Sequence, residues 1–283
     1  MDDGDEGEVM TDERGPTSGE PAAVEPIPSD PTLVEPIPGE PAAVVETDGR
    51  RFVALADFHA GIEAGLRVER GVNLESRAPE RRERVLDLVA SEGADAVVVV
   101  GDFMHSIGGP GGAERGEVEV LLEALGVPVT VVKGNHDGEL ADWADVTVTD
   151  PGGVRIGDVG FAHGHTWPNA DVLDADVVCV GHEHPQVRLT DEVGGSRVER
   201  AWLRGGRDPT PFADHVAVDD ADGDHAGLRA DGELVVFPAF NELCGGTWVN
   251  VGGDFLSPFL PDALVDGEAY LLDGTRLGAY DRI

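Results

Sequence analysis

The sequence predicts an α/β fold in which a β-sandwich is flanked by helices, and three observations lead to it. Val-rich apolar runs alternate with helical patterns between about residues 50 and 135, which is typical of parallel strands joined by helices. Beyond residue 150 the runs become shorter and are separated by turns. His, Asp and Asn follow directly on several of these runs, as expected for polar side chains that gather where strands end.

The first half is expected to fold as strand, helix, strand, helix, strand. Residues 52–56 form a short strand, and a helix follows over about 76–93, where a glycine supplies the stop. Residues 95–100 are a continuous apolar run of the kind found in fully buried parallel strands. A second helix at about 115–125 and a strand at 127–132 complete the pattern.

The second half is expected to consist of short strands and turns. The expected strands, which include hairpins across Gly157-Asp158 and at Asp273-Gly274, are 154–156, 159–162, 176–180, 187–189, 234–237 and 248–251. Strand 187–189 is expected to pair with strand 176–180. Residues 205–232 are expected to form an acidic loop.

Residues 1–39 are predicted to form an acidic, proline-rich flexible tail. A ten-residue unit containing proline occurs twice between Glu20 and Gly39, and a degraded copy follows it. Proline at this density forbids a helix and weakens a strand, so an extended arm is expected. Residues 40–283 are predicted to be a single domain, with folded structure beginning near Arg50.

The charge of the chain is extreme. A net charge of −36 arises from 56 acidic and 20 basic residues, and all but one of the basic residues, Lys133, are Arg. Such a chain repels itself in dilute buffer, whereas molar salt screens the repulsion over about 3 Å. The composition therefore resembles that of proteins from salt-loving (halophilic) organisms, and it does not exclude nucleic acid as a partner.

Cysteine and hydropathy patterns exclude two classes of protein. Cys179 and Cys244 are too few for a disulfide framework, and both are expected in apolar surroundings. No run approaches the roughly 20 apolar residues of a membrane span. Because the acidic N-terminus also lacks the basic start of a signal peptide, a cytoplasmic protein with no membrane partner is expected.

Seven of the nine histidines lie in short segments beside Asp, Asn or another His. These segments are Asp57-Phe58-His59, Asp102-Phe103-Met104-His105, Asn135-His136-Asp137, His163-Gly164-His165 and His182-Glu183-His184. Imidazole, carboxylate and amide oxygen are ligands of Mn, Fe, Zn and related divalent ions. They are too many for one ion and suit two ions that share a carboxylate, so a two-metal hydrolytic centre is the leading hypothesis.

In this order the segments resemble the motifs of the calcineurin-like metallophosphoesterase superfamily, over roughly residues 51–190. The second motif ends in His105, as in the SbcD-type DNA repair nucleases, whereas Asp is commoner in the superfamily. Pro185 and the stretch 238–246 resemble a smaller archaeal SbcD-related phosphoesterase group. The resemblance implies a metallophosphoesterase-type β-sandwich with a dinuclear metal site at the C-terminal ends of its strands.

The resemblance also implies roles for individual residues. Asp102 would bridge two metal ions, the first held by Asp57, His59 and His184 and the second by Asn135, His163 and His182. His136 is the candidate general acid for the leaving oxygen, and His105 would support it or touch the phosphate. The cofactors would be two divalent ions, with Mn favoured and Fe or Zn as alternatives.

These residues favour a metal-dependent phosphodiesterase that acts on a phosphate ester, with DNA as the substrate if the protein is a repair-type nuclease. A small-molecule phosphatase or a cyclic-nucleotide phosphodiesterase is the alternative. A non-catalytic scaffold would tolerate missing ligands, and none of the ligands is missing here.

Several other residues have more than one interpretation. His165 is expected behind the ligands or in solvent, and Asp137 is expected to bond an imidazole. Asn241 could reach the site or cap a turn, and Trp167 could stack on a base or pack in the interior. Six arginines form either a helix face in solvent or a surface for a phosphate backbone: Arg67, Arg70, Arg77, Arg81, Arg82 and Arg84.

Overall fold

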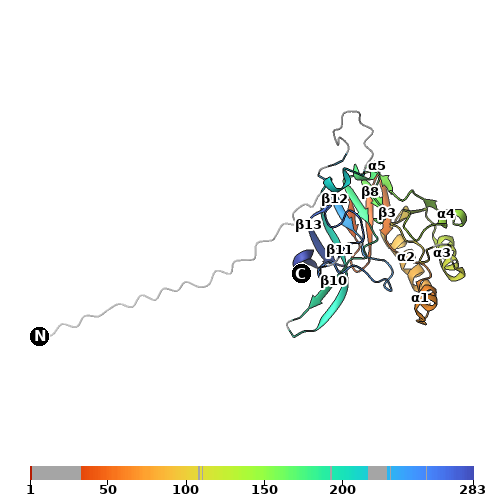
Figure 1. The fold of residues 1–283 in the computed structure, drawn as a ribbon, viewed down its shortest axis with the longest axis horizontal. Helices are drawn as coiled ribbons and strands as arrows, with labels where there is room; N and C mark the ends of the chain where they lie inside the picture. The colour runs from red at the N-terminus through yellow and green to blue at the C-terminus, as the bar shows by residue number, and fades with distance from the viewer. Residues whose placement is uncertain are drawn as a thin grey trace, which may run out of the picture. The chain divides into compact units, whose positions relative to one another are not determined.

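Two β-sheets pack face to face in the computed structural model, with helices on their outer faces (Figure 1). The structure describes residues 1, 33–107, 109, 111–191, 193–215, 228–229, 231–252 and 254–283. Residues Leu33–Ile283 form one unit. None of the helices in the described residues has the length and apolar character that a bilayer crossing needs.

The first sheet has six strands in the order β1-β2-β3-β4-β5-β6. They are β1 (Val34–Pro36), β2 (Ala42–Thr47), β3 (Arg50–Leu55), β4 (Ala96–Val99), β5 (Val129–Val131) and β6 (Thr147–Val148). The pairs β1–β2 and β2–β3 are antiparallel, whereas β3 to β6 run parallel. The connections between the parallel strands contain the helices α1 (Ile62–Arg70), α2 (Ala78–Glu92), α3 (Gly112–Ala124) and α4 (Leu140–Trp143).

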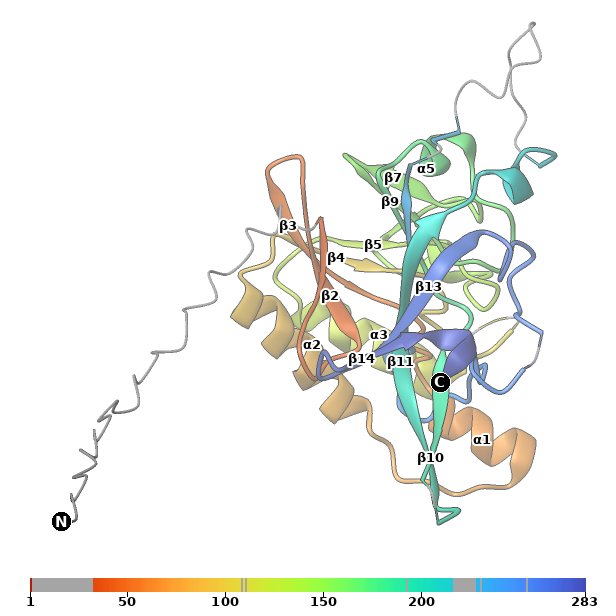
Figure 2. The same ribbon diagram turned by 90° about the vertical axis from the view of Figure 1, so that its left-hand side faces the viewer.

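The second sheet has the order β14-β13-β11-β12-β9-β8-β7, and β10 pairs with β11 beside this path. Its strands are β7 (Val154–Ile156), β8 (Val159–Ala162), β9 (Val177–Val180), β10 (Gln186–Thr190), β11 (Ser196–Arg207), β12 (Glu233–Val236), β13 (Leu264–Leu271) and β14 (Arg276–Ala279). Strands β8, β9 and β12 are parallel, and β10 and β11 project from the sheet as a long hairpin (Figure 2). One short helix, α5 (Ala170–Leu173), and two 3-10 turns, Thr210–Phe212 and Tyr280–Arg282, lie in its connections and at the C-terminus.

The sheets share a core because side chains alternate between the two faces of a strand. In β3, Phe52 and Ala54 belong to the core between the sheets, together with Trp202 of β11. Their neighbours Val53 and Leu55 belong to the core that α2 and α3 cover. The apolar runs of the sequence are therefore buried on both faces.

The carboxyl ends of five parallel strands meet at one edge of this sandwich. Strands β3, β4 and β5 of the first sheet end there, and so do β8 and β9 of the second. A parallel bridge between Ala56 and Ala239 joins the two sheets just beyond their strands. The Asp57 N–H donates to the Gly101 carbonyl at 3.1 Å, so the segments after β3 and β4 stay paired as well.

The predicted fold class is confirmed, but the predicted start of the folded part is wrong. Strands β1 and β2 both precede Arg50, and β1 pairs with β2 along its whole length. Val34 is fully buried, so residues 33–39, which were predicted as part of the tail, belong to the folded unit. The remainder of the predicted tail, residues 2–32, lies outside the described residues.

Three expectations for the second half are also wrong. Residues 187–189 pair with β11 and not with 176–180. Residues 248–251 form no strand, and Trp248 makes a single bridge to Gln186. Residues 205–207, which were expected in a loop, belong to β11. The charged and glycine-containing sequence of β11 lacks the apolar run of a buried strand. Residues 216–227 and 230 of the expected loop lie outside the described residues.

Candidate metal centre

The segments that follow the strands have a rare backbone conformation. Five of the seven non-glycine residues with positive φ in the described part of the chain are Asp57, His59, Asp102, His182 and His184. Such conformations cost roughly 1–3 kcal/mol each and persist only where the surrounding structure imposes them. All five are predicted metal ligands, so the backbone strain coincides with the predicted site.

Asp102 lies at the centre of these side chains. Its Oδ2 atom is 3.2 Å from His163 Nε2, 3.8 Å from His59 Nε2 and 3.7 Å from His136 Nε2. Its Oδ1 atom accepts a hydrogen bond of 2.9 Å from the backbone N–H of His136, which fixes the carboxylate. Asp102 belongs to two groups of donor atoms, one with His59 and His136 and one with His163 and His182, and within each group all atoms lie within 4.8 Å of one another.

His163 and His182 reach Asp102 from the second sheet. The Nδ1–H of the fully buried His163 donates to the Val100 carbonyl at 3.1 Å, so Nε2 faces Asp102. The same Nε2 lies 3.2 Å from Asn135 Oδ1, and the His182 ring centre is 4.9 Å from that of His163. This part of the site offers only oxygen and nitrogen donors.

Asp57, His59 and His184 form the other part of the site. Asp57 is fully buried, accepts a hydrogen bond of 3.1 Å from the His182 backbone N–H, and lies 3.1 Å from His184 Nε2. The Nδ1–H of His184 donates to the Gly245 carbonyl at 2.8 Å, which turns Nε2 toward Asp57. The ring centres of His59 and His184 are 5.3 Å apart.

The chemistry of this donor set fits divalent cations. Asp57 and Asp102 are two buried carboxylates in one site, and buried like charges need a compensating positive charge. His59 Nδ1 is buried and has no hydrogen-bond partner among the described residues. Burial lowers the pKa of His59 to about 3 and that of His182 to about 4, so both rings are neutral and keep a lone pair for a metal. Burial by itself would lower the pKa of His163, but the adjacent Asp102 carboxylate has the larger effect and raises this pKa to about 9.

His136 and His105 stand beside the predicted ligands. The Nδ1–H of His136 donates to the His105 carbonyl, which leaves Nε2 facing Asp102. The two rings stack with centres 6.1 Å apart, and the His105 ring lies 5.5 Å from that of His59. The His105 backbone N–H donates to the buried Glu114 carboxylate at 2.6 Å, which holds this segment in place.

Two glycines allow the segments to approach so closely. Gly101 has a φ of +81°, and a Cβ at this position would collide with the His163 ring. A Cβ on Gly134 would collide with the Asp102 carboxylate. Any side chain at either position therefore displaces a predicted ligand.

The structure decides among the interpretations that the sequence left open. The prediction for Asp137 is wrong, because its carboxylate accepts hydrogen bonds from the Met104 and Gly134 backbone N–H groups, at 3.1 and 2.9 Å, and not from an imidazole. The His165 ring stands behind the predicted ligands, 5.3 Å from the His163 ring. Trp167 stacks on His215 with ring centres 3.6 Å apart, so packing is the correct interpretation for this residue.

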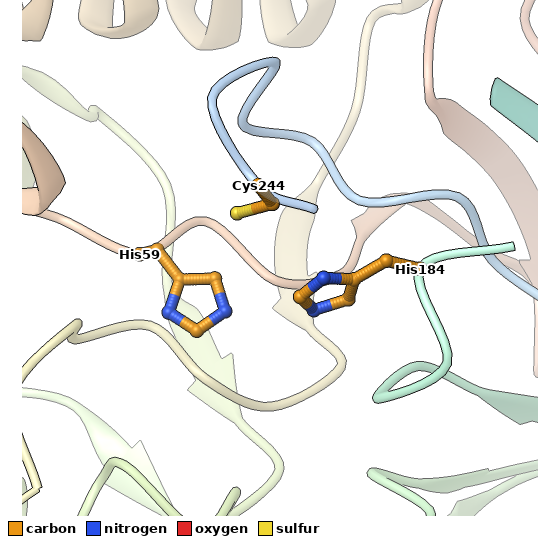
Figure 3. Close-up of side chains that lie close together, drawn as sticks. All are labelled: His59, His184 and Cys244. Carbon is orange, nitrogen blue, oxygen red and sulfur yellow. The ribbon is translucent and has the colours of Figure 1, made fainter. Parts of the chain in front are cut away.

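The loop next to Asp57, His59 and His184 carries a donor, Cys244, that was not predicted at the site. Cys244, expected in apolar surroundings, lies with His59 and His184 in a third group of donor atoms that are all within 4.8 Å of one another (Figure 3). Asn241 is buried and donates to the Phe58 and His59 carbonyls at 2.9 and 3.3 Å. The resemblance of residues 238–246 to the SbcD-related group was the one signal that could have pointed to this loop.

Three of the six arginines of the predicted basic surface pair with glutamates. The paired arginines and their partners are Arg77 with Glu242, Arg81 with Glu63 and Glu117, and Arg84 with Glu40. Arg81 is buried, so it cannot bind a phosphate backbone. Arg67 and Arg70 are exposed in the last turn of α1. A Cβ on Gly65 of the same helix would collide with the His105 ring, which places α1 directly against the site.

Comparison with known proteins points to one family. A sequence model of the calcineurin-like phosphoesterases matches residues 50–230, and no curated protein sequence matches the chain significantly. The fold is similar to that of nuclease MPE from Pseudomonas putida, with a TM-score of 0.50, 18% identity, and coverage of 86% of this chain and 100% of the nuclease. The phosphoesterase Yfce from E. coli matches with a TM-score of 0.33 and 25% identity over 50% of this chain and 73% of its own. A Vps29 double mutant from Entamoeba histolytica matches with a TM-score of 0.25 and 19% identity, over 52% of this chain and 71% of its own.

Proposed function

Since this chain belongs to the calcineurin-like phosphoesterase family, we propose that it is a two-metal hydrolase of phosphodiester bonds that acts on nucleic acid. The observation that carries the proposal is the position of Asp102, whose carboxylate is shared by two groups of donor atoms. A shared carboxylate is what two dications about 3.5–4 Å apart require, because it offsets their repulsion.

In the proposed centre Asp102 would be shared by the two ions. Asp57, His59 and His184 would hold the first ion, and Asn135, His163 and His182 would hold the second. Mn²⁺ suits this set of oxygen and nitrogen donors, and Fe²⁺ or Zn²⁺ fit it as well. When bound, such a pair supplies a water activated near neutral pH and positive charge for the phosphoryl oxygens.

His136 is the proposed general acid. Its Nδ1–H remains bonded to the His105 carbonyl, so the proton that it gives to the leaving oxygen is the one on Nε2 of the imidazolium. His105 lies between His136 and α1, and we propose that its ring orients the phosphate.

Three observations support a nucleic-acid substrate of the SbcD-related type. The second motif ends in His105, and the Pseudomonas putida protein of similar fold is a nuclease. Arg67 and Arg70, exposed on the helix that packs against His105, offer positive charge where a phosphate backbone would pass. The excess of acidic residues further supports an enzyme that works in molar salt.

The proposed function can be tested with three substrates in high salt and Mn²⁺: single-stranded DNA, a chromogenic bis-ester and the corresponding mono-ester. We expect hydrolysis of DNA and of the bis-ester, and His136→Ala should lower kcat/KM for both by about 10²–10⁴-fold. His215→Ala serves as the matched control, because His215 stacks on Trp167 and not on a predicted ligand. Hydrolysis of the mono-ester alone would indicate a small-molecule phosphatase, and hydrolysis of the bis-ester without DNA would favour a cyclic-nucleotide phosphodiesterase.

A further inference from the structure

The thiol of Cys244 faces the predicted first metal position. Cys244 Sγ, a ring nitrogen of His59 and a ring nitrogen of His184 all lie within 4.8 Å of one another. Figure 3 shows the three side chains converging from separate parts of the chain: His59 after β3, His184 after β9, and Cys244 in the loop after β12. The arrangement offers one sulfur and two nitrogen donors around a common point.

The loop that carries Cys244 is fixed on both of its sides. On one side, the Phe240 N–H donates to the Ala56 carbonyl at 2.8 Å. The Asn241 side chain donates to the carbonyls of Phe58 and His59. On the other side, the Gly245 carbonyl accepts the Nδ1–H of His184. The thiol is thus held between two predicted ligands by contacts with the same segments that carry them.

The charge of this region also favours a metal at this point. His59 is 4% exposed, and its Nε2 lies 3.8 Å from the buried Asp102 carboxylate. Buried carboxylates need a compensating positive charge. The fully buried Asp57 carboxylate, 3.1 Å from His184 Nε2, completes the donor set.

We propose that Cys244 is a thiolate ligand of the first metal ion, together with Asp57, His59 and His184. This inference rests on the proposed two-metal centre and specifies its metal. When sulfur binds, the thiol releases its proton to solvent, and no redox change is involved. Thiolate favours Zn²⁺ or Fe²⁺ over Mn²⁺, whereas the second position has only oxygen and nitrogen donors and suits Mn²⁺. The two positions therefore bind different metals.

Spectroscopy of the metal-loaded protein tests this without an activity assay. Full-length protein loaded with Co²⁺ should show an intense sulfur-to-cobalt charge-transfer absorption in the near ultraviolet. Cys244→Ser should abolish this band and weaken the binding of one of two Zn²⁺ ions at least about tenfold. Cys179→Ala is the matched control: Cys179, the other cysteine of the chain, is buried in β9, and its removal should leave the band unchanged.

X-ray absorption of the Zn²⁺-loaded wild type gives a result that needs no variant. We expect one of the two bound zinc ions to have a sulfur neighbour at about 2.3 Å. A wild-type spectrum without sulfur, or a charge-transfer band that persists in Cys244→Ser, overturns the inference. If sulfur is present but no phosphodiester is hydrolysed, the proposed reaction fails while the ligand assignment stands.

Discussion

At the scale of single residues, the site depends on residues at the strand ends whose backbone conformation is rare. Asp57 and Asp102 both have positive φ, at 56° and 46°, in a region that non-glycine residues seldom adopt. Hydrogen bonds from the backbone hold each carboxylate, from His182 N–H to Asp57 and from His136 N–H to Asp102. The two carboxylates are thus fixed before any cation binds, which reduces the entropy lost on binding.

Asp102→Asn tests the bridging role directly. Loss of the shared negative charge removes what offsets the repulsion of two dications, so we expect the bound metal to fall from two ions to one or none. The value of kcat/KM for the bis-ester should fall at least about 10³-fold, which corresponds to about 4 kcal/mol. Elemental analysis and kinetics provide the measurement. Asp142→Asn, at an exposed position of α4, is the control and should retain both ions; full metal content in the Asp102 variant would contradict the assignment.

At the scale of secondary-structure elements, buried charges connect the helices next to the site. Arg81 of α2 donates to Glu63 of α1 at 2.7 and 3.0 Å and to Glu117 of α3 at 2.8 and 2.9 Å. Glu117 also accepts the Gly61 N–H at 2.8 Å, at the start of α1. One guanidinium therefore fixes α1, which packs against His105, relative to α2 and α3.

Arg81→Met should destabilise the protein strongly. The substitution leaves two buried carboxylates without a counter-charge, which typically costs about 3–5 kcal/mol of unfolding free energy. Arg70→Met, on the exposed end of α1, should change the unfolding free energy by no more than about 0.5 kcal/mol. Denaturant titration in high salt measures both variants, and equal stability of the two would show that the buried pairs contribute little.

The first strand sets the boundary of the folded unit. We expect a chain of residues 33–283 to fold, and a chain of residues 40–283 to be less stable by at least about 2 kcal/mol, because it lacks β1 and the buried side chain of Val34. Thermal unfolding of the two chains at the same salt concentration compares them. Identical midpoints would support the boundary at residue 40 that the sequence suggested.

At the scale of the whole molecule, charge dominates. The net charge of −36 falls on 283 residues, and many of the few arginines are already paired with carboxylates, including Arg204 with Glu233 and Arg155 with Asp174. Mutual repulsion of the remaining carboxylates opposes the folded state, and its range shrinks from about 10 Å at 0.1 M salt to about 3 Å at 1 M.

Stability should therefore rise with salt concentration. We expect the unfolding temperature to increase by more than about 10 °C between 0.1 and 2 M KCl, since each kcal/mol shifts the midpoint by about 2–4 °C in a chain of this size. Circular dichroism during heating provides the measurement. Sucrose at equal osmolality is the control, because it does not screen charge; an equal gain in sucrose would exclude repulsion as the cause.

Local pattern was sufficient for much of the fold. The helix at 78–92 and the strands at 96–99, 154–156 and 159–162 lie within a residue or two of the expected ranges, because their apolar periodicity and glycine stops are contained in the segments themselves. The antiparallel edge strand β1 and the long β11 were not recognised. Their sequences carry proline, charge and glycine, and they become strands through pairing: β1 pairs with the next strand, β2, and β11 pairs with β12 and β13 further along the chain.

Local patterns are enough to predict that Asp57, Asp102 and His163 meet at one edge of the sandwich, because they follow buried strands and parallel strands end on the same side of a sheet. The position of Cys244 beside His59 and His184, and the burial of Arg81 among glutamates, follow from the tertiary fold alone. Those contacts join segments far apart in the chain, and their geometry follows from how the two sheets and their helices pack, which no local pattern encodes.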